Sequence, residues 1–251
     1  MADTKEETAV DNAGQEVDQK PEMKRSAEPG FEGFQLFYEK NRNLVNYAGG
    51  GLLVLIAGLL YFKLFYLPEQ ETYAANELYH AQKYFEQDSF RVALNGGIMV
   101  MSPDGQKQMM GFTQIADEYG LTRSGNLAHY YAGISLLRTG QFETAIDHLQ
   151  KYDGDDEIVA PIAVGAIGDC HMEMNSPGDA IKFYLKAADK RENSFTTPYF
   201  LRKAGFAQEI NKEYAAAAST YERIKKEYPN SAEGREIDRD IARAKALDSA
   251  E

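Results

Sequence analysis

An uncharged apolar run near the N-terminus dominates the hydrophobic pattern of this chain. From Leu44 to Phe62 the sequence reads LVNYAGGGLLVLIAGLLYF, nineteen residues without a charged side chain. As a helix this stretch would be roughly 28 Å long, close to the hydrocarbon thickness of a bilayer. A helix satisfies its own backbone hydrogen bonds in lipid, so the run predicts one transmembrane anchor, residues 44–67. The alternative is a buried core helix of a soluble protein, although such helices seldom lack charge for so long.

The sequence around this run predicts that the anchor is retained and how it is oriented. The run is preceded by 43 residues and is followed by no small-residue cleavage site, which favours an uncleaved signal anchor. The bases nearest to it on the N-terminal side are Lys24, Arg25, Lys40 and Arg42. After it, Lys63 is followed by the acids Glu69 and Glu71. This bias predicts a cytoplasmic N-terminus and an extracytoplasmic C-terminal domain.

Two different segments precede the anchor. Residues 1–30 carry eight acids, four bases and few large apolar side chains, which predicts a disordered acidic cytoplasmic tail. Residues 31–43 read FEGFQLFYEKNRN, with aromatic residues at helical spacing. This juxtamembrane segment is therefore expected to be an amphipathic helix, either a simple interface anchor or a docking site.

Residues 69–251 repeat one helix–turn–helix pattern. It occurs at residues 126–152, 162–188 and 199–229, where small residues alternate with bulky ones at helical spacing. Gly133, Gly168 and Gly205 mark equivalent positions separated by 35 and 37 residues. The tetratricopeptide repeat has a period of about 34 residues and a similar distribution of small and aromatic positions. With no strand pattern detected, the expected fold is all-α, an N-terminal transmembrane helix followed by a tetratricopeptide-repeat-like α-solenoid.

Several other segments fit the same plan. Asn175 and Lys212 stand where the first copy has the turn glycine Gly140. Residues 72–94 predict a degenerate first helix pair, and residues 111–119 predict a further helix. After the closing proline, residues 231–246 predict a charged capping helix with a thin apolar side at Ile237, Ile241 and Ala244.

Two motifs support a resemblance. Residues 125–133 read GNLAHYYAG and residues 223–231 read RIKKEYPNS. With the single anchor and the repeats, they resemble the YfgM-like family, single-span tetratricopeptide proteins ancillary to the SecYEG translocon. The resemblance implies association with translocon subunits and with exported, unfolded polypeptides in the periplasm. Other envelope proteins, among them a cell-division coordinator, share this repeat type, so the choice among envelope repeat proteins stays open.

The sequence contains no recognisable catalytic motif. The four histidines are scattered, the single Cys170 permits no intrachain disulfide, and neither a phosphate-binding glycine loop nor a nucleophile motif occurs. A net charge of −12 argues against nucleic acid as a partner. The acidic run at residues 153–157 (DGDDE) could bind a calcium ion, although an exposed loop between repeats is the simpler interpretation. We expect a non-enzymatic protein with no cofactor, metal or small-molecule substrate.

The first helices of stacked repeats line a concave groove. The phase set by the three glycines places ten residues on that face, and they are Tyr130, Ile134, Leu137, Arg138, Asp169, Met172, Glu173, Arg202, Phe206 and Glu209. Such a mixture of aromatic, apolar and charged residues suits an extended peptide or a partner's helix, although some of these residues could instead pack between repeats. The methionine-rich segment Asn95–Met110 is a second candidate, either a binding loop or an ordinary insertion.

These observations favour a membrane-anchored adaptor. We expect a single-pass protein of the bacterial cytoplasmic (inner) membrane whose periplasmic domain binds translocon subunits, exported polypeptides or other envelope proteins. The anchor would contribute by confining weak binding sites to a surface. The alternative is a structural scaffold or coordinator of an envelope assembly such as the cell-division or cell-wall machinery.

Overall fold

A computed structural model of the chain describes residues 29–102 and 105–250. It divides into two compact units, Met1–Gly58 and Leu59–Glu251. The predicted disordered tail lies outside the described residues, except that Pro29 and Gly30 already belong to the first helix.

The first unit contains helix α1 (Pro29–Lys40) and most of helix α2 (Arg42–Tyr61). The Tyr38 hydroxyl donates a hydrogen bond to Asn46 Oδ1 at 3.1 Å. No residue of α2 is buried. The chain is helical without a break from Arg42 to Glu86, and by length and composition this is the one helix of the described ranges that could cross a membrane.

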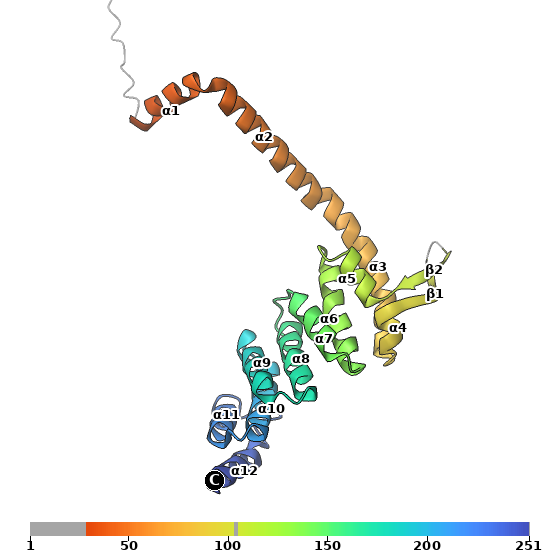
Figure 1. The fold of residues 1–251 in the computed structure, drawn as a ribbon, viewed down its shortest axis with the longest axis vertical. Coiled ribbons are helices and arrows are strands. Elements are labelled where there is room, and N and C mark those ends of the chain that lie inside the picture. The colour runs from red at the N-terminus through yellow and green to blue at the C-terminus, as the bar shows by residue number, and fades with distance from the viewer. Residues whose placement is uncertain (1–28, 103–104, 251) are drawn as a thin grey trace, which may run out of the picture. The chain divides into compact units, whose positions relative to one another are not determined.

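The second unit is an array of antiparallel helices (Figure 1). A short π-helical segment, Phe62–Tyr66, leads into α3 (Leu67–Glu86) and α4 (Phe90–Asn95). Helix α5 (Phe112–Glu118) precedes three stacked pairs and a last helix, α12 (Ile237–Asp248). The pairs are α6 (Arg123–Arg138) with α7 (Phe142–Lys151), α8 (Val159–Glu173) with α9 (Pro177–Lys190), and α10 (Thr196–Ile210) with α11 (Tyr214–Glu227).

One packing contact recurs in all three pairs. The glycine of the first helix receives a bulky side chain of the second helix, sixteen residues further along the chain. A Cβ atom added to Gly133, Gly168 or Gly205 would lie 2.5, 2.7 or 2.2 Å from Leu149, Tyr184 or Tyr221 respectively. Because glycine has no side chain, the two helices approach closely enough to bury the leucine side chain or the tyrosine ring between them. This contact explains the period that the sequence shows.

The turns within the pairs also share one backbone conformation. Gly140, Asn175 and Lys212 have φ values of 81°, 58° and 62°. The left-handed region is easiest for glycine and tolerable for asparagine, whereas Lys212 adopts it at some cost. The predicted equivalence of these three positions is therefore confirmed. Asp88, with φ of 55°, occupies the corresponding turn between α3 and α4, the degenerate pair.

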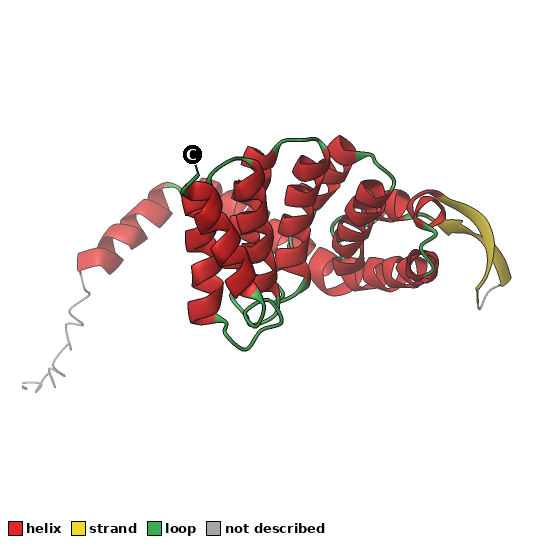
Figure 2. Cartoon of the chain, turned by 90° about the horizontal axis from the view of Figure 1, so that it is seen from below, coloured by secondary structure: helices red, strands yellow, loops and turns green. Residues whose placement is uncertain are grey.

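The expectation that the chain has no strands is wrong. Gly96–Ser102 (β1) and Gly105–Met110 (β2) form an antiparallel hairpin, drawn in yellow in Figure 2, where residues 95–110 were expected to be a loop. Met109 is buried, and the Lys107 ammonium forms an ion pair with Glu77 of α3. The ion pair thus attaches β2 to α3.

The capping helix begins later than predicted. Residues 231–236 form turns, and α12 starts at Ile237, because the backbone at Gly234 folds against Tyr228: a Cβ atom there would lie 2.1 Å from the Tyr228 carbonyl oxygen. Ile237, Ile241 and Ala244 are buried against the last repeat, as the apolar side predicts.

Candidate functional site

Three adjoining hollows follow the first helices of the repeats, α6, α8 and α10. The central hollow has a volume of about 890 Å³, and those toward α4 and α12 have volumes of about 460 and 510 Å³. The central one shares Leu137, Arg138 and Asp169 with the first neighbour, and Lys203 and Phe206 with the second. The hollows therefore form one continuous surface, which we call the concave groove.

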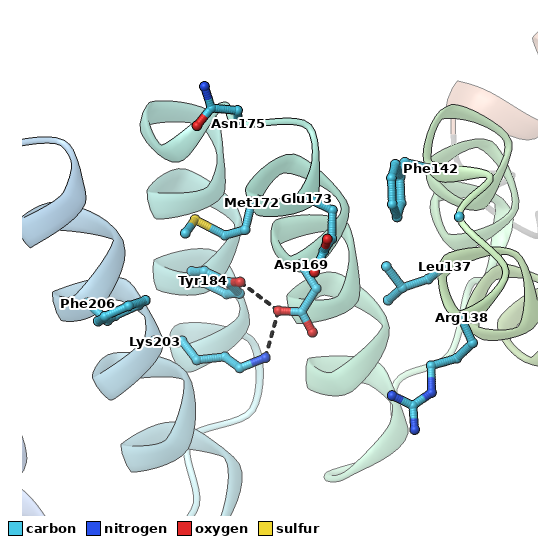
Figure 3. Close-up of a pocket in the computed structure, with 11 residues that line it drawn as sticks. Leu137, Arg138, Phe142, Asp169, Met172, Glu173, Asn175, Tyr184, Lys203 and Phe206 are labelled. Atoms are coloured by element: carbon cyan, nitrogen blue, oxygen red, sulfur yellow. Dashed lines mark hydrogen bonds and ion pairs between the residues drawn. The ribbon is translucent and has the colours of Figure 1, made fainter.

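Asp169 is at the centre of this groove (Figure 3). Its Oδ1 atom accepts hydrogen bonds from the Tyr184 hydroxyl and from the Lys203 ammonium, each at 2.6 Å. The three side chains come from α8, α9 and α10. The Lys203 ammonium also lies 5.4 Å and 5.1 Å from the ring centroids of Tyr184 and Tyr199, a cation–π arrangement. The cluster thus joins two neighbouring repeats at the floor of the groove.

The ionisation of this cluster follows from its surroundings. Burial raises the pKa of Tyr184, and the negative charge of Asp169 raises it further. Burial lowers the pKa of Lys203, but the charge of Asp169, its hydrogen bond and the nearby Tyr199 together outweigh that effect, so this pKa is raised overall. At neutral pH Tyr184 is therefore a neutral donor and Lys203 a cation.

Apolar side chains surround the cluster. Leu137 and Phe142 come from the first pair, Met172 comes from α8, and Phe206 of α10 is 53% exposed. The Arg138 guanidinium lies 5.6 Å from the centre of the Phe90 ring and, among the described residues, forms no ion pair. The groove therefore offers exposed apolar contacts beside a positively charged group.

Helix α12 closes one end of the groove through an ionic network. Arg202 Nε donates to Asp240 Oδ2 at 2.9 Å, and Arg243 donates to Asp240 Oδ1 at 2.9 Å and to Glu209 Oε2 at 3.0 Å. Asp240 is only 3% exposed, so its side chain is buried beneath these arginines.

Nine of the ten residues predicted for the groove line the three hollows. They are Tyr130, Ile134, Leu137, Arg138, Asp169, Met172, Glu173, Arg202 and Phe206. Glu209 is not among the lining residues, because its carboxylate is occupied by Arg243. Whether these residues bind a partner stays a prediction.

Sequence reasoning missed several lining residues. Tyr199 stands three residues before Arg202 on the same helix, so the helical period could have found it. Lys203 follows Arg202 directly, and because adjacent residues of a helix point in different directions, the helical period did not predict it. Tyr184 is on α9, the second helix of its pair, and therefore outside the first-helix face on which the prediction rests, but its hydroxyl donates to Asp169 in the groove.

The acidic run at residues 153–157 has a structural role. Asp156 Oδ1 accepts hydrogen bonds from the backbone N–H groups of Ile158, at 3.0 Å, and Val159, and it therefore caps the start of α8. Within residues 29–102 and 105–250, no group of three or more His, Cys, Asp or Glu side chains is arranged to hold a metal ion.

The geometry defines an array of helix–turn–helix repeats with a groove on its concave side. Residues 200–231, which cover most of α10 and α11, match the family model described as tetratricopeptide repeat. The chain therefore contains a tetratricopeptide repeat, a module that mediates protein–protein interaction. A comparison with curated proteins finds no significant match.

Proposed function

We propose that the protein is a non-enzymatic, membrane-anchored adaptor whose concave groove binds an extended segment or a helix of another protein. The observation that carries the proposal is the continuity of the groove across three repeats, with exposed apolar side chains around the Asp169–Lys203 pair. Grooves of this kind accept a partner through a few anchoring side chains, while the charged groups set its register.

The paired state of the groove's polar centre supports binding and not catalysis. Asp169, Tyr184 and Lys203 satisfy one another, and the shifts of their pKa values hold Tyr184 and Lys203 away from the neutral range in which a proton-transfer group works best.

The proposed location is the bacterial cytoplasmic (inner) membrane, with the repeats in the periplasm. It rests on the uncharged run from Leu44 to Phe62, on the absence of any buried residue from α2 and on the charge bias around the run. A helix with apolar side chains that are not buried by protein within the described part of the chain suits lipid. From the resemblance to the YfgM-like family we further propose translocon subunits and exported polypeptides as partners.

Site-specific photocrosslinking in intact cells tests the proposal. A photoreactive amino acid replaces Arg138 or Phe206 in the groove, and Lys182 in the control. Lys182 is on α9 with 76% of its side chain exposed, and it forms an ion pair with Asp179, three residues earlier on the same helix. We expect the two groove positions to crosslink to identified translocon subunits or exported proteins, and Lys182 not to do so.

Other outcomes would count against this function. Equal crosslinking from Lys182, or none from the groove, contradicts groove binding. Crosslinks between two copies of this chain would instead support the scaffold role, and crosslinks to cytoplasmic proteins would contradict the proposed orientation.

A further inference from the structure

The loop between α5 and α6 presents an unusually exposed apolar residue. Leu121 is 78% exposed, more than any other large apolar residue of the second unit among those described. The loop itself is firmly held. The Thr122 backbone N–H and hydroxyl both donate to the Tyr119 carbonyl oxygen, at 2.8 and 2.7 Å, and Thr122 Oγ1 accepts from the Gly125 N–H at 2.9 Å. A rigid backbone therefore keeps Leu121 in solvent, although burying a leucine is favourable by about 2 kcal/mol.

Leu121 lies beside the end of the uncharged apolar run and not elsewhere on the array. It lines a hollow of about 270 Å³ together with Phe62, Tyr66, Leu67 and Gln70. Phe62 is the last residue of the uncharged run. Tyr66 follows one turn later, roughly 6 Å along the helix, which matches the thickness of the polar layer on each side of a bilayer, roughly 5–8 Å. Leu121 is thus at the level where aromatic residues anchor proteins to membranes.

A carboxylate of α3 fixes the loop at this level. Glu71 Oε2 accepts from the backbone N–H of Arg123 at 2.7 Å and of Ser124 at 3.2 Å, and Glu71 Oε1 accepts from the Ser124 hydroxyl at 2.7 Å. A carboxylate at a helix N-terminus is favoured by the helix dipole and by the unpaired N–H groups. Helix α3 thereby caps α6, and the loop cannot move along α3 without breaking three hydrogen bonds.

We infer that Leu121, with Phe62, Phe65 and Tyr66, forms a second membrane contact, and that a lipid bilayer surface is its occupant. The inference rests on the proposed membrane anchor and adds that the repeat domain is docked on the bilayer, not merely tethered to it. Phe65 and Tyr66 are 66% and 46% exposed and stack on Tyr61 and Phe62, so the aromatic surface continues from the anchor to the loop. The neighbouring Asp117 and Glu118 are exposed acids, which favour zwitterionic over anionic headgroups.

Depth measurements on the full chain in phosphatidylcholine vesicles test this contact. A fluorescent probe is attached to a cysteine that replaces Leu121, Leu55 or Phe195 in turn. Leu55 is in the uncharged run, and Phe195 is a matched control, a 68% exposed apolar residue in the loop before α10. The native Cys170 is fully buried, and burial raises its pKa, so it does not compete for the label.

The three probes separate the contact from the anchor. We expect lipids labelled with a nitroxide in the headgroup to quench the Leu121 probe several-fold more than the Phe195 probe, and acyl-chain nitroxides to quench the Leu55 probe. If the Leu55 probe is quenched but the Leu121 probe behaves like the Phe195 probe, the docking contact is refuted and the anchor stands. If the Leu55 probe is not quenched by lipid, both the anchor and the contact are refuted.

Discussion

Gly205 of α10 packs so closely against Tyr221 of α11 that a Cβ atom on Gly205 would lie 2.2 Å from Tyr221 Cε1. The same relationship joins Gly168 to Tyr184 and Gly133 to Leu149. Tyr221 is 1% exposed, so its ring cannot turn into solvent to make room. Close helix approach at a glycine is therefore the unit from which the array is built.

Replacing Gly205 by alanine should destabilise the last repeat by about 1–3 kcal/mol, because the new methyl group overpacks a filled interface. Thermal unfolding in mild detergent, followed by circular dichroism, measures the effect. Gly178→Ala is the control: the nearest atom to a Cβ there is Asn211 Nδ2 at 3.7 Å. That change should be neutral or stabilising by up to about 1 kcal/mol. Equal effects of the two substitutions would show that the close contact is unimportant.

The Asp169–Lys203 pair should contribute to stability as well as to the groove. Lys203→Met leaves a partly buried carboxylate with Tyr184 as its remaining donor, and we expect a loss of about 1–3 kcal/mol. The matched change Lys182→Met breaks the exposed pair with Asp179 and should leave the unfolding midpoint almost unchanged. Unfolding midpoints of the two variants in the same detergent compare them. A larger loss for Lys182→Met would refute the role assigned to the pair.

Asp240 should decide whether α12 stays attached. Asp240→Asn removes the buried carboxylate that Arg202 and Arg243 share, and the loss of these charge-assisted hydrogen bonds should cost about 1.5–3 kcal/mol. We expect trypsin to cleave around residues 231–239 well before it cleaves the repeats. Asp238→Asn, which breaks an exposed pair with Lys225, is the control and should leave the digestion pattern unchanged. Uniform protection of the Asp240 variant would contradict the network's role.

The His129–His148 contact should make stability depend on pH. The two Nδ1 atoms are 3.2 Å apart, so one ring must donate to the other and the pair cannot hold two charges there. Burial lowers the pKa of both rings, and His148 further lowers that of His129. The unfolded chain therefore binds protons first, near the ordinary histidine pKa of about 6.5, and stability falls as the pH drops through and below that value.

His148→Asn tests this dependence. The variant lacks one of the two histidines with a lowered pKa. It also removes the ring that contributes to the lowered pKa of His129. Its unfolding midpoint should therefore fall less steeply than that of the unmodified protein between about pH 7.5 and pH 5.5. Identical slopes in both proteins would mean that the pair does not control acid sensitivity.

Several features could be predicted because they involve residues close together in the chain. The uncharged run extends over many consecutive residues. The helix pairs, and their turns at Gly140, Asn175 and Lys212, occur three times. The concave face followed from the same phase, since side chains three and four residues apart on a helix share a side. Residue spacing within single helices thus placed nine of the ten predicted residues in the groove, but it did not predict the lining that α4, α9, α11 and α12 contribute.

The sequence by itself therefore determined the apolar helix, the repeat period and the faces of the helices. Only the tertiary structure decided the β1–β2 hairpin, the Asp169–Tyr184–Lys203 cluster and the cap that Glu71 places on α6. Glu71 and Ser124 are 53 residues apart, and Asp169 and Lys203 are 34 apart. Such contacts depend on which helices become neighbours when the apolar faces are buried, and no pattern confined to one helix encodes that choice.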